Sequence, residues 1–142
     1  MTTEEIINTI ALIGLGGIFK SIYDSYSENK KKINEKRHQF KEPRYKAILL
    51  LLYALLYYDK QAEKLKRHRP DIQSKEDLID EVKVECANMI LFASDEVILA
   101  MKDFIKDVNS NNYTKTALAI RKDLYELKTK LTPQNINPDA IQ

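Results

Sequence analysis

Glu35 and His38 stand three residues apart in a stretch that we expect to be helical. This Glu-x-x-His spacing is the one with which helical bundles bind a pair of iron ions, but those sites need two such motifs and two further carboxylates. The single motif here lies among lysines, and their charges repel a cation. We therefore expect Glu35 and His38 to lie on a solvated helix face.

Asp77, Glu81 and Glu85 recur every four residues, so a helix would carry all three on one face. Oxygen ligands in such a row could bind a hard cation, or they could form a solvated face that pairs with a basic surface. For His68, the sequence identifies no nucleophile and no orienting carboxylate that would make it a general base. We assign no catalytic residue, cofactor or metal site, and we expect a protein that is not an enzyme.

The strongest electrostatic feature is a cluster of cations between residues 30 and 46. Residues 20–69 hold 14 basic and 6 acidic side chains, a net charge of +8, whereas residues 71–107 hold 4 basic and 10 acidic ones, a net charge of −6. Beside a membrane helix, each cation near the surface attracts anionic lipid by about 1 kcal/mol. The residues expected to contact anionic lipid or a partner are Lys30, Lys31, Lys32, Lys36, Arg37, Lys41, Arg44 and Lys46.

In solution the same cations could bind the phosphates of a nucleic acid. Few aromatic residues alternate with them, however, and the sequence has no recognised nucleic-acid-binding motif. We therefore treat nucleic acid as an unlikely partner and keep its binding through the basic half as an alternative function.

The uncharged run Ile6–Phe19 determines whether the chain works on a membrane or in solution. Its 14 residues span about 21 Å as a helix, and a helix that crosses a bilayer needs about 20 residues. The run can be extended, because Lys20 can reach back to the lipid surface and Tyr23 and Tyr26 suit the depth of the interface. We predict that residues 1–26 form a membrane anchor; the alternative is a helix buried in the bundle or in an oligomer interface.

Cations follow this run on its C-terminal side, whereas the start of the chain is acidic. The positive-inside rule then places the N-terminus outside and the rest of the chain in the cytoplasm. Cys86 is the single cysteine, so the chain cannot form an internal disulfide, and this fits a reducing compartment.

The elements that must position these residues are helices. No segment alternates with a period of two and no hairpin turn is present, so we predict an all-α bundle of four to five helices with a long N-terminal helix. We expect the first helix to reach about Phe40 before Pro43 ends it. A second helix then carries the apolar run Ala47–Tyr58, covered on nearly all sides, and continues to a basic end that Pro70 stops.

The second half of the chain contains three further helix patterns. Ser74 and Asp77 predict a capping box for the third helix, and Ser94 predicts either a second cap or a kink in a continuous helix. A fourth amphipathic helix precedes a loop at residues 109–112. The fifth has a heptad seam from Tyr113 to Leu131. Residues 27–132 thus form the bundle domain and residues 133–142 a polar tail.

Three stretches, FKEPRYKAIL at 40–49, ANMILFASDEV at 87–97 and ALAIRKDL at 117–124, resemble small bacterial proteins with an N-terminal membrane segment and a helical cytoplasmic domain. The resemblance covers residues 40–131 and implies a helical domain anchored in the inner membrane. No activity is known for these proteins, so no functional residue is carried over. We expect five polar residues to form a structural network or a partner surface, and they are Asn88, Ser94, Asp95, Arg121 and Asp123. Within this set, Arg121 could form an ion pair with Asp95 or Asp123.

Together these patterns predict a non-catalytic interaction or scaffolding module, anchored in the bacterial inner membrane through Ile6–Phe19, with its helical domain in the cytoplasm. We expect it to bind a protein partner or a second copy of itself through the third to fifth helices, and to need no cofactor. One alternative is a soluble, cytoplasmic regulatory protein that binds nucleic acid. The other is a small carboxylate-based metal protein.

Overall fold

The computed structural model describes the backbone of residues 3–127 and 129–140, and the side chains of residues 17–18, 20–127 and 129–139. The all-α prediction is confirmed, because the described residues form helices and no strand. The helices are α1 (Thr3–Leu56), α2 (Tyr58–His68), α3 (Lys75–Met89), α4 (Asp95–Lys106), α5 (Ser110–Tyr125) and the short 3₁₀ helix η1 (Pro138–Ala140).

The chain divides into two units, residues 1–39 and residues 40–142. In the first unit, the backbone of the predicted anchor Ile6–Phe19 is helical, but most of its side chains lie outside the described residues. The described side chains from Gly17 to Gln39 are exposed, apart from the half-buried Ser27 and His38. In the part of the chain that the structure describes, none of the helices combines the length and apolarity that crossing a membrane requires.

Pro43 lies inside α1, so the prediction that it ends the first helix was wrong. A proline in a helix interior removes one backbone hydrogen bond and costs about 3 kcal/mol or more. The stretch that follows compensates for this cost, because each large side chain that it buries contributes about 1.5–3 kcal/mol. These buried side chains, spaced three or four residues apart, are Tyr45, Ile48, Leu52 and Leu55.

The sequence predicted that the apolar run in the C-terminal part of α1 is covered on nearly all sides, and this prediction was wrong. One face is buried, but Leu50 on another face is 70% exposed and Tyr53 is also exposed. The helix ends at Leu56, and α2 begins at Tyr58 as a separate element. The apolar run therefore has a free face, and this face borders a groove described below.

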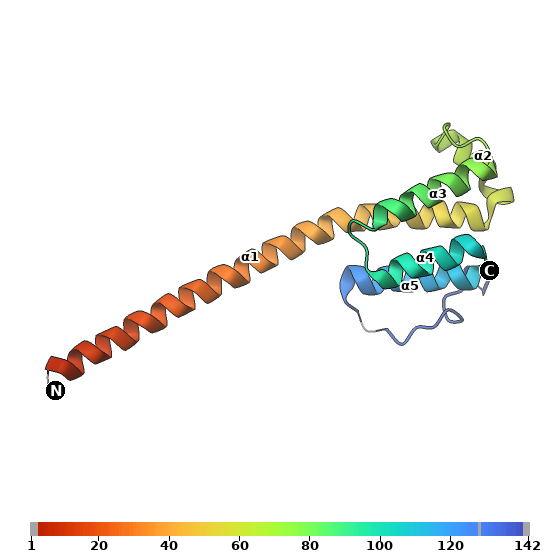
Figure 1. The fold of residues 1–142 in the computed structure, drawn as a ribbon. Helices are drawn as coiled ribbons and strands as arrows, with labels where there is room; N and C mark the ends of the chain where they lie inside the picture. Colours follow the sequence, from red (N-terminus) through yellow and green to blue (C-terminus); the bar gives the residue numbers. More distant parts are fainter. Residues whose placement is uncertain (1–2, 128, 141–142) are drawn as a thin grey trace. The chain divides into compact units, whose positions relative to one another are not determined.

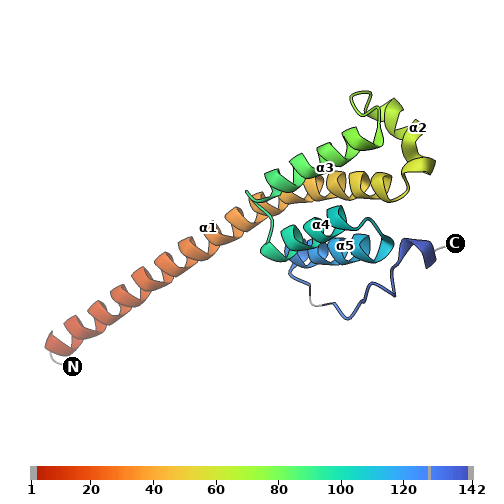
Figure 2. The same cartoon turned by 45° about the vertical axis from the view of Figure 1, so that its right-hand side comes forward.

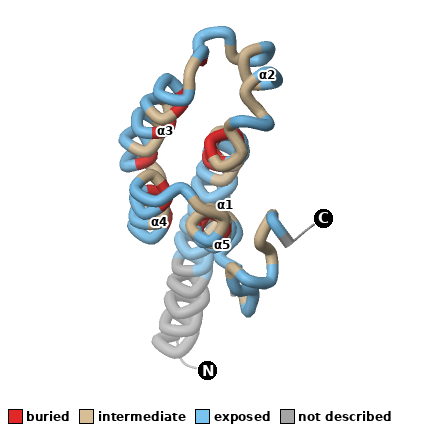
Figure 3. Tube along the Cα trace, turned by 90° about the vertical axis from the view of Figure 1, so that its right-hand side faces the viewer, coloured by how far each residue is buried: buried red, intermediate tan, exposed pale blue. Residues whose placement is uncertain are grey.

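The core of residues 40–142 lies between the buried face of α1 and helices α3 to α5. Figures 1 and 2 show α4 and α5 side by side, joined by a short connection. Buried residues lie on α1, α3, α4 and α5 in Figure 3, and α2 carries none. The largest fully buried side chains outside α1 are Phe104, Leu78, Met89, Met101, Val82 and Val97.

The helix caps largely follow the local sequence. Ser74 and Asp77 form the predicted capping box, in which each side chain accepts a backbone N–H of the other residue. Ser94 caps α4 by accepting the N–H of Val97, so it marks a helix start and not a kink. The loop predicted at residues 109–112 was wrong beyond Asn109, because α5 begins at Ser110. Asn109 caps this helix by accepting the N–H of Asn112 at 2.8 Å.

The heptad seam that predicted a helix to Leu131 overstates the length of α5. This helix ends at Tyr125, and Glu126 adopts a left-handed conformation (φ 53°) while its N–H donates to the carbonyl of Lys122. Leu127 and Leu131 therefore follow the helix, and both are exposed. A left-handed residue of this kind is a common way to stop a helix.

Candidate interaction surface

Lys41 and Tyr45, one turn apart on α1, both donate hydrogen bonds to Oδ2 of Asp123 on α5. The distance between Lys41 Nζ and Asp123 Oδ2 is 2.9 Å, and the two side chains are only 11% and 12% exposed. Burial and the hydrogen bond to Asp123 raise the pKa of Tyr45. This three-residue contact ties α1 to the C-terminal end of α5.

The contact corrects two predictions made from the sequence. Lys41 was expected to contact lipid or a partner, but it is buried and its ammonium group is used inside the bundle. Arg121 was expected to pair with Asp95 or Asp123, yet it is exposed and forms no ion pair with any described residue. Across α4 and α5, the observed ion pair joins Lys122 Nζ and Glu96 Oε2 at 2.7 Å.

The rest of the predicted polar network is dispersed. Ser94 caps α4, and Asp95 is an exposed residue of the first turn of that helix. Asn88 is exposed, and its carbonyl accepts the N–H of Leu91. Of the five predicted residues, Asp123 is the one whose side chain joins two helices through a nearly buried ion pair.

Arg44 lies on α1 between the two partners of Asp123 and stacks on two aromatic rings. Its guanidinium carbon is 4.6 Å from the ring centroid of Phe40 and 5.7 Å from that of Phe92. The two rings meet edge to face, with centroids 5.6 Å apart. A cation over an aromatic face is favourable by about 0.5–1 kcal/mol at an exposed site. These contacts hold the turn between α3 and α4 against α1.

Two large aliphatic residues precede Phe92 in this turn and face solvent. Ile90 is 68% exposed and Leu91 is 87% exposed. Their backbone N–H groups donate to the carbonyls of Ala87 and Asn88, so the turn has a defined conformation although the side chains have few neighbours. We call this surface the Leu91 tip, and its residues are Phe40, Arg44, Ile90, Leu91 and Phe92.

The remaining predicted cations are exposed. Lys46 forms an exposed ion pair with Glu42 at 2.7 Å, which raises the pKa of Lys46. The predicted cations in the first unit lie on α1 and have exposed side chains; they are Lys30, Lys31, Lys32, Lys36 and Arg37.

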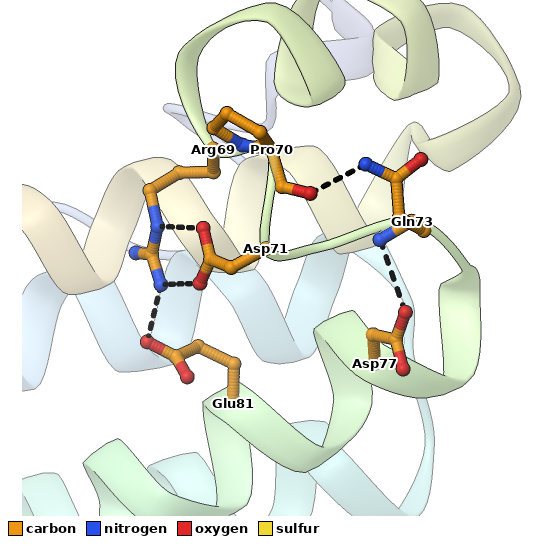
Figure 4. Close-up of polar contacts among 6 residues, drawn as sticks. All are labelled: Arg69, Pro70, Asp71, Gln73, Asp77 and Glu81. Carbon is orange, nitrogen blue, oxygen red and sulfur yellow. Dashed lines mark hydrogen bonds and ion pairs between the residues drawn. The ribbon is translucent and has the colours of Figure 1, made fainter.

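Two of the three carboxylates that could have bound a cation are used elsewhere. Asp77 belongs to the capping box, and Glu81 accepts a hydrogen bond from Arg69, whose guanidinium also forms two hydrogen bonds with Asp71 (Figure 4). Among the residues that the structure describes, no three His, Cys, Asp or Glu side chains lie close enough together to hold a metal ion.

The Leu91 tip combines an apolar turn with a fixed guanidinium, an arrangement that can enter an apolar phase beside anionic groups. The aromatic pair was missed by sequence reasoning, because Phe40 and Phe92 stand far apart in the chain. The sequence feature that could have indicated this surface is the run of three adjacent large apolar residues, Ile90, Leu91 and Phe92. No family model, curated protein or solved structure matches this chain.

Proposed function

We propose that the chain is a membrane-anchored, non-catalytic interaction module whose helical unit, residues 40–142, contacts an anionic lipid surface through the Leu91 tip. The observation that carries the proposal is the exposure of Ile90 and Leu91 on a turn that Arg44 and two aromatic rings hold in place. Burial of each aliphatic side chain in lipid would contribute about 1.5–3 kcal/mol. Arg44 would add about 1 kcal/mol at an anionic surface.

Such a tip by itself gives weak and reversible binding, because stable attachment generally needs a second membrane contact. The N-terminal part of α1 is the proposed second contact. As a helix, residues 6–26 would be about 31 Å long, close to the roughly 30 Å of a bilayer core. Lys20 can reach the lipid surface along its aliphatic stem, and Asp24 falls near the end of this segment.

The order of the exposed side chains along α1 supports this second contact. Ile18 and Ile22 come first, with the exposed Lys20 between them, Tyr23 and Tyr26 follow, and a run of cations starts at Lys30. This is the order in which apolar residues, an aromatic belt and anionic-lipid contacts occur when a helix leaves a bilayer. By the positive-inside rule, the helical unit would lie in the cytoplasm.

The partner surface of the proposed module lies on the outer faces of the bundle. Val84 on α3 and Leu99 on α4 are large apolar side chains that remain exposed. A protein partner, or a second copy of the chain, would cover them while the tip holds the unit beside the membrane.

The chain contains no tryptophan, so a single introduced tryptophan reports on its own surroundings. We would place Leu91→Trp in the full-length chain, with Leu99→Trp as the matched control, and add vesicles of zwitterionic lipid with or without anionic lipid. The proposal predicts a blue shift of the Leu91→Trp emission and quenching by brominated lipid, both stronger with anionic lipid. The Leu99→Trp emission should change little.

Equal responses of the two tryptophans would contradict the proposal, as would no response of Leu91→Trp to either vesicle. A change on addition of duplex DNA that weakens steeply with salt would instead favour the alternative of nucleic-acid binding.

A further inference from the structure

A groove lies between the C-terminal part of α1 and α2, with a volume of about 630 Å³. The lining residues recur at helical spacing on α1 from Ala47 to Ala54 and on α2 from Gln61 to His68, and Arg69 follows directly after α2. Each wall therefore runs for about two helical turns, or roughly 10 Å. Aliphatic residues provide most of the apolar part of the lining, and they are Ala47, Leu50, Leu51, Ala54 and Leu65.

The apolar side chains of this groove are not covered by the fold. None of the residues of α2, all of which the structure describes, is buried, although Leu65 packs at the edge of the core. Leu50 is largely exposed. A second hollow of about 550 Å³ shares Leu50 and Tyr53 with the groove and extends to Tyr113. An apolar chain could thus cross Leu50 from one hollow into the other.

The polar part of the lining includes Gln61, Lys64, His68 and Arg69, and two of these residues, Lys64 and Arg69, carry a positive charge. Lys64 and His68 are exposed and stand four residues apart, so they occupy the same face of α2 along the groove. Arg69 also lines the groove, but its guanidinium is held by Asp71 and Glu81 (Figure 4), which fixes the end of the wall. Lys64 and His68 are therefore the groups that can receive an anion.

We propose that this groove binds a single-chain amphiphile with a carboxylate headgroup, that is, a fatty acid. Its volume lies within the usual range of about 300–1,000 Å³ for small-molecule sites, which are mostly apolar with a few placed polar groups. The acyl chain would cover Leu50, Leu51 and Ala54, and the carboxylate would accept hydrogen bonds from Lys64 and His68. This binding needs no membrane and is independent of the Leu91 tip.

The test is titration of the full-length chain with dodecanoate below its micelle concentration, followed by NMR or calorimetry. We expect saturable binding of dodecanoate, with NMR chemical-shift changes at the residues of α1 and α2 that line the groove. Lys64→Gln should weaken binding about tenfold, because it removes a charge-assisted hydrogen bond. Arg67→Gln is the matched control, since it removes one charge from an exposed position of α2 outside the lining and should leave the affinity unchanged.

A second variant separates the groove from other apolar surfaces. Ala47 is exposed and lines the groove, so Ala47→Trp would fill the space without disturbing the core. This variant should abolish binding of dodecanoate and also of dodecanol, which has the same chain length without the carboxylate. Replacement of Ile90 and Leu91 by serine should have no effect. The proposal is overturned if dodecanoate does not saturate, if Arg67→Gln weakens binding as much as Lys64→Gln, or if Ala47→Trp leaves the affinity unchanged.

Discussion

Asp123→Ala should strongly destabilise the helical unit, because it removes the acceptor for both Lys41 and Tyr45. The ammonium group of Lys41 would remain nearly buried without a counter-charge. Removing one partner of a buried ion pair costs about 3–5 kcal/mol. Since the two side chains are slightly exposed, at 11% and 12%, we expect the lower end of this range, about 3 kcal/mol.

This loss is large relative to the total stability of a domain, which is typically about 5–15 kcal/mol. For a unit of this size, 1 kcal/mol corresponds to a change of about 4–8 °C in Tm, so Tm should fall by roughly 12–24 °C. The assay is urea and thermal unfolding followed by circular dichroism. The urea midpoint should fall while the slope of the transition stays the same.

Two control variants identify the cause of the loss. Glu96→Ala removes the exposed ion pair with Lys122 and should cost less than about 1 kcal/mol. Replacing Lys41 by Met and Asp123 by Leu together should recover most of the stability lost in Asp123→Ala, since no unpaired charge is then buried. A cost for Asp123→Ala no larger than that for Glu96→Ala would show that the Lys41–Asp123 pair contributes little, as would a double variant that is as unstable as Asp123→Ala.

Three further predictions concern the same unit. Tyr45→Phe should lower the free energy of unfolding by about 1 kcal/mol at neutral pH. Because the pKa of Tyr45 is raised in the folded chain, the stabilisation from the tyrosine hydroxyl is complete below the ordinary pKa of 10.0 and is lost above it. In urea titrations at rising pH, the difference in unfolding free energy between wild type and Tyr45→Phe should therefore shrink by up to about 1.4 kcal/mol per pH unit. A constant difference across this range would contradict the assignment. Ser74→Ala removes the cap of α3 and should lower the free energy of unfolding in urea by about 1 kcal/mol, whereas the exposed Lys75→Ala should have little effect. Pro43→Ala restores a backbone N–H within α1, so it should raise the free energy of unfolding by about 1–3 kcal/mol and raise Tm accordingly. A lower Tm would mean that packing of the proline ring contributes more than the restored backbone hydrogen bond.

The features that could be predicted from the sequence are those set by neighbouring residues. The helical class follows from apolar periodicity, and the caps at Ser74 and Ser94 follow from side chains that bond to backbone groups three residues away. Pro43 was misjudged because local propensity favours a break there, while burial of Tyr45, Ile48 and Leu52 on the following turns outweighs it.

The candidate surfaces depend on contacts between distant parts of the chain. Lys41 and Asp123 are 82 residues apart, and no local pattern distinguishes a lysine that will be buried from the exposed lysines near it. The apolar run around Leu50 suggests a helix buried on all sides. Whether one face stays open depends on where α2 lies, which the sequence of the run does not specify.

Fractionation of cells that express the full-length chain tests the proposed membrane anchoring most directly. We expect the chain to sediment with membranes, to stay there through high-salt and carbonate washes, and to be released only by detergent. Recovery of the folded full-length chain in the soluble fraction, without detergent, would contradict membrane anchoring through α1.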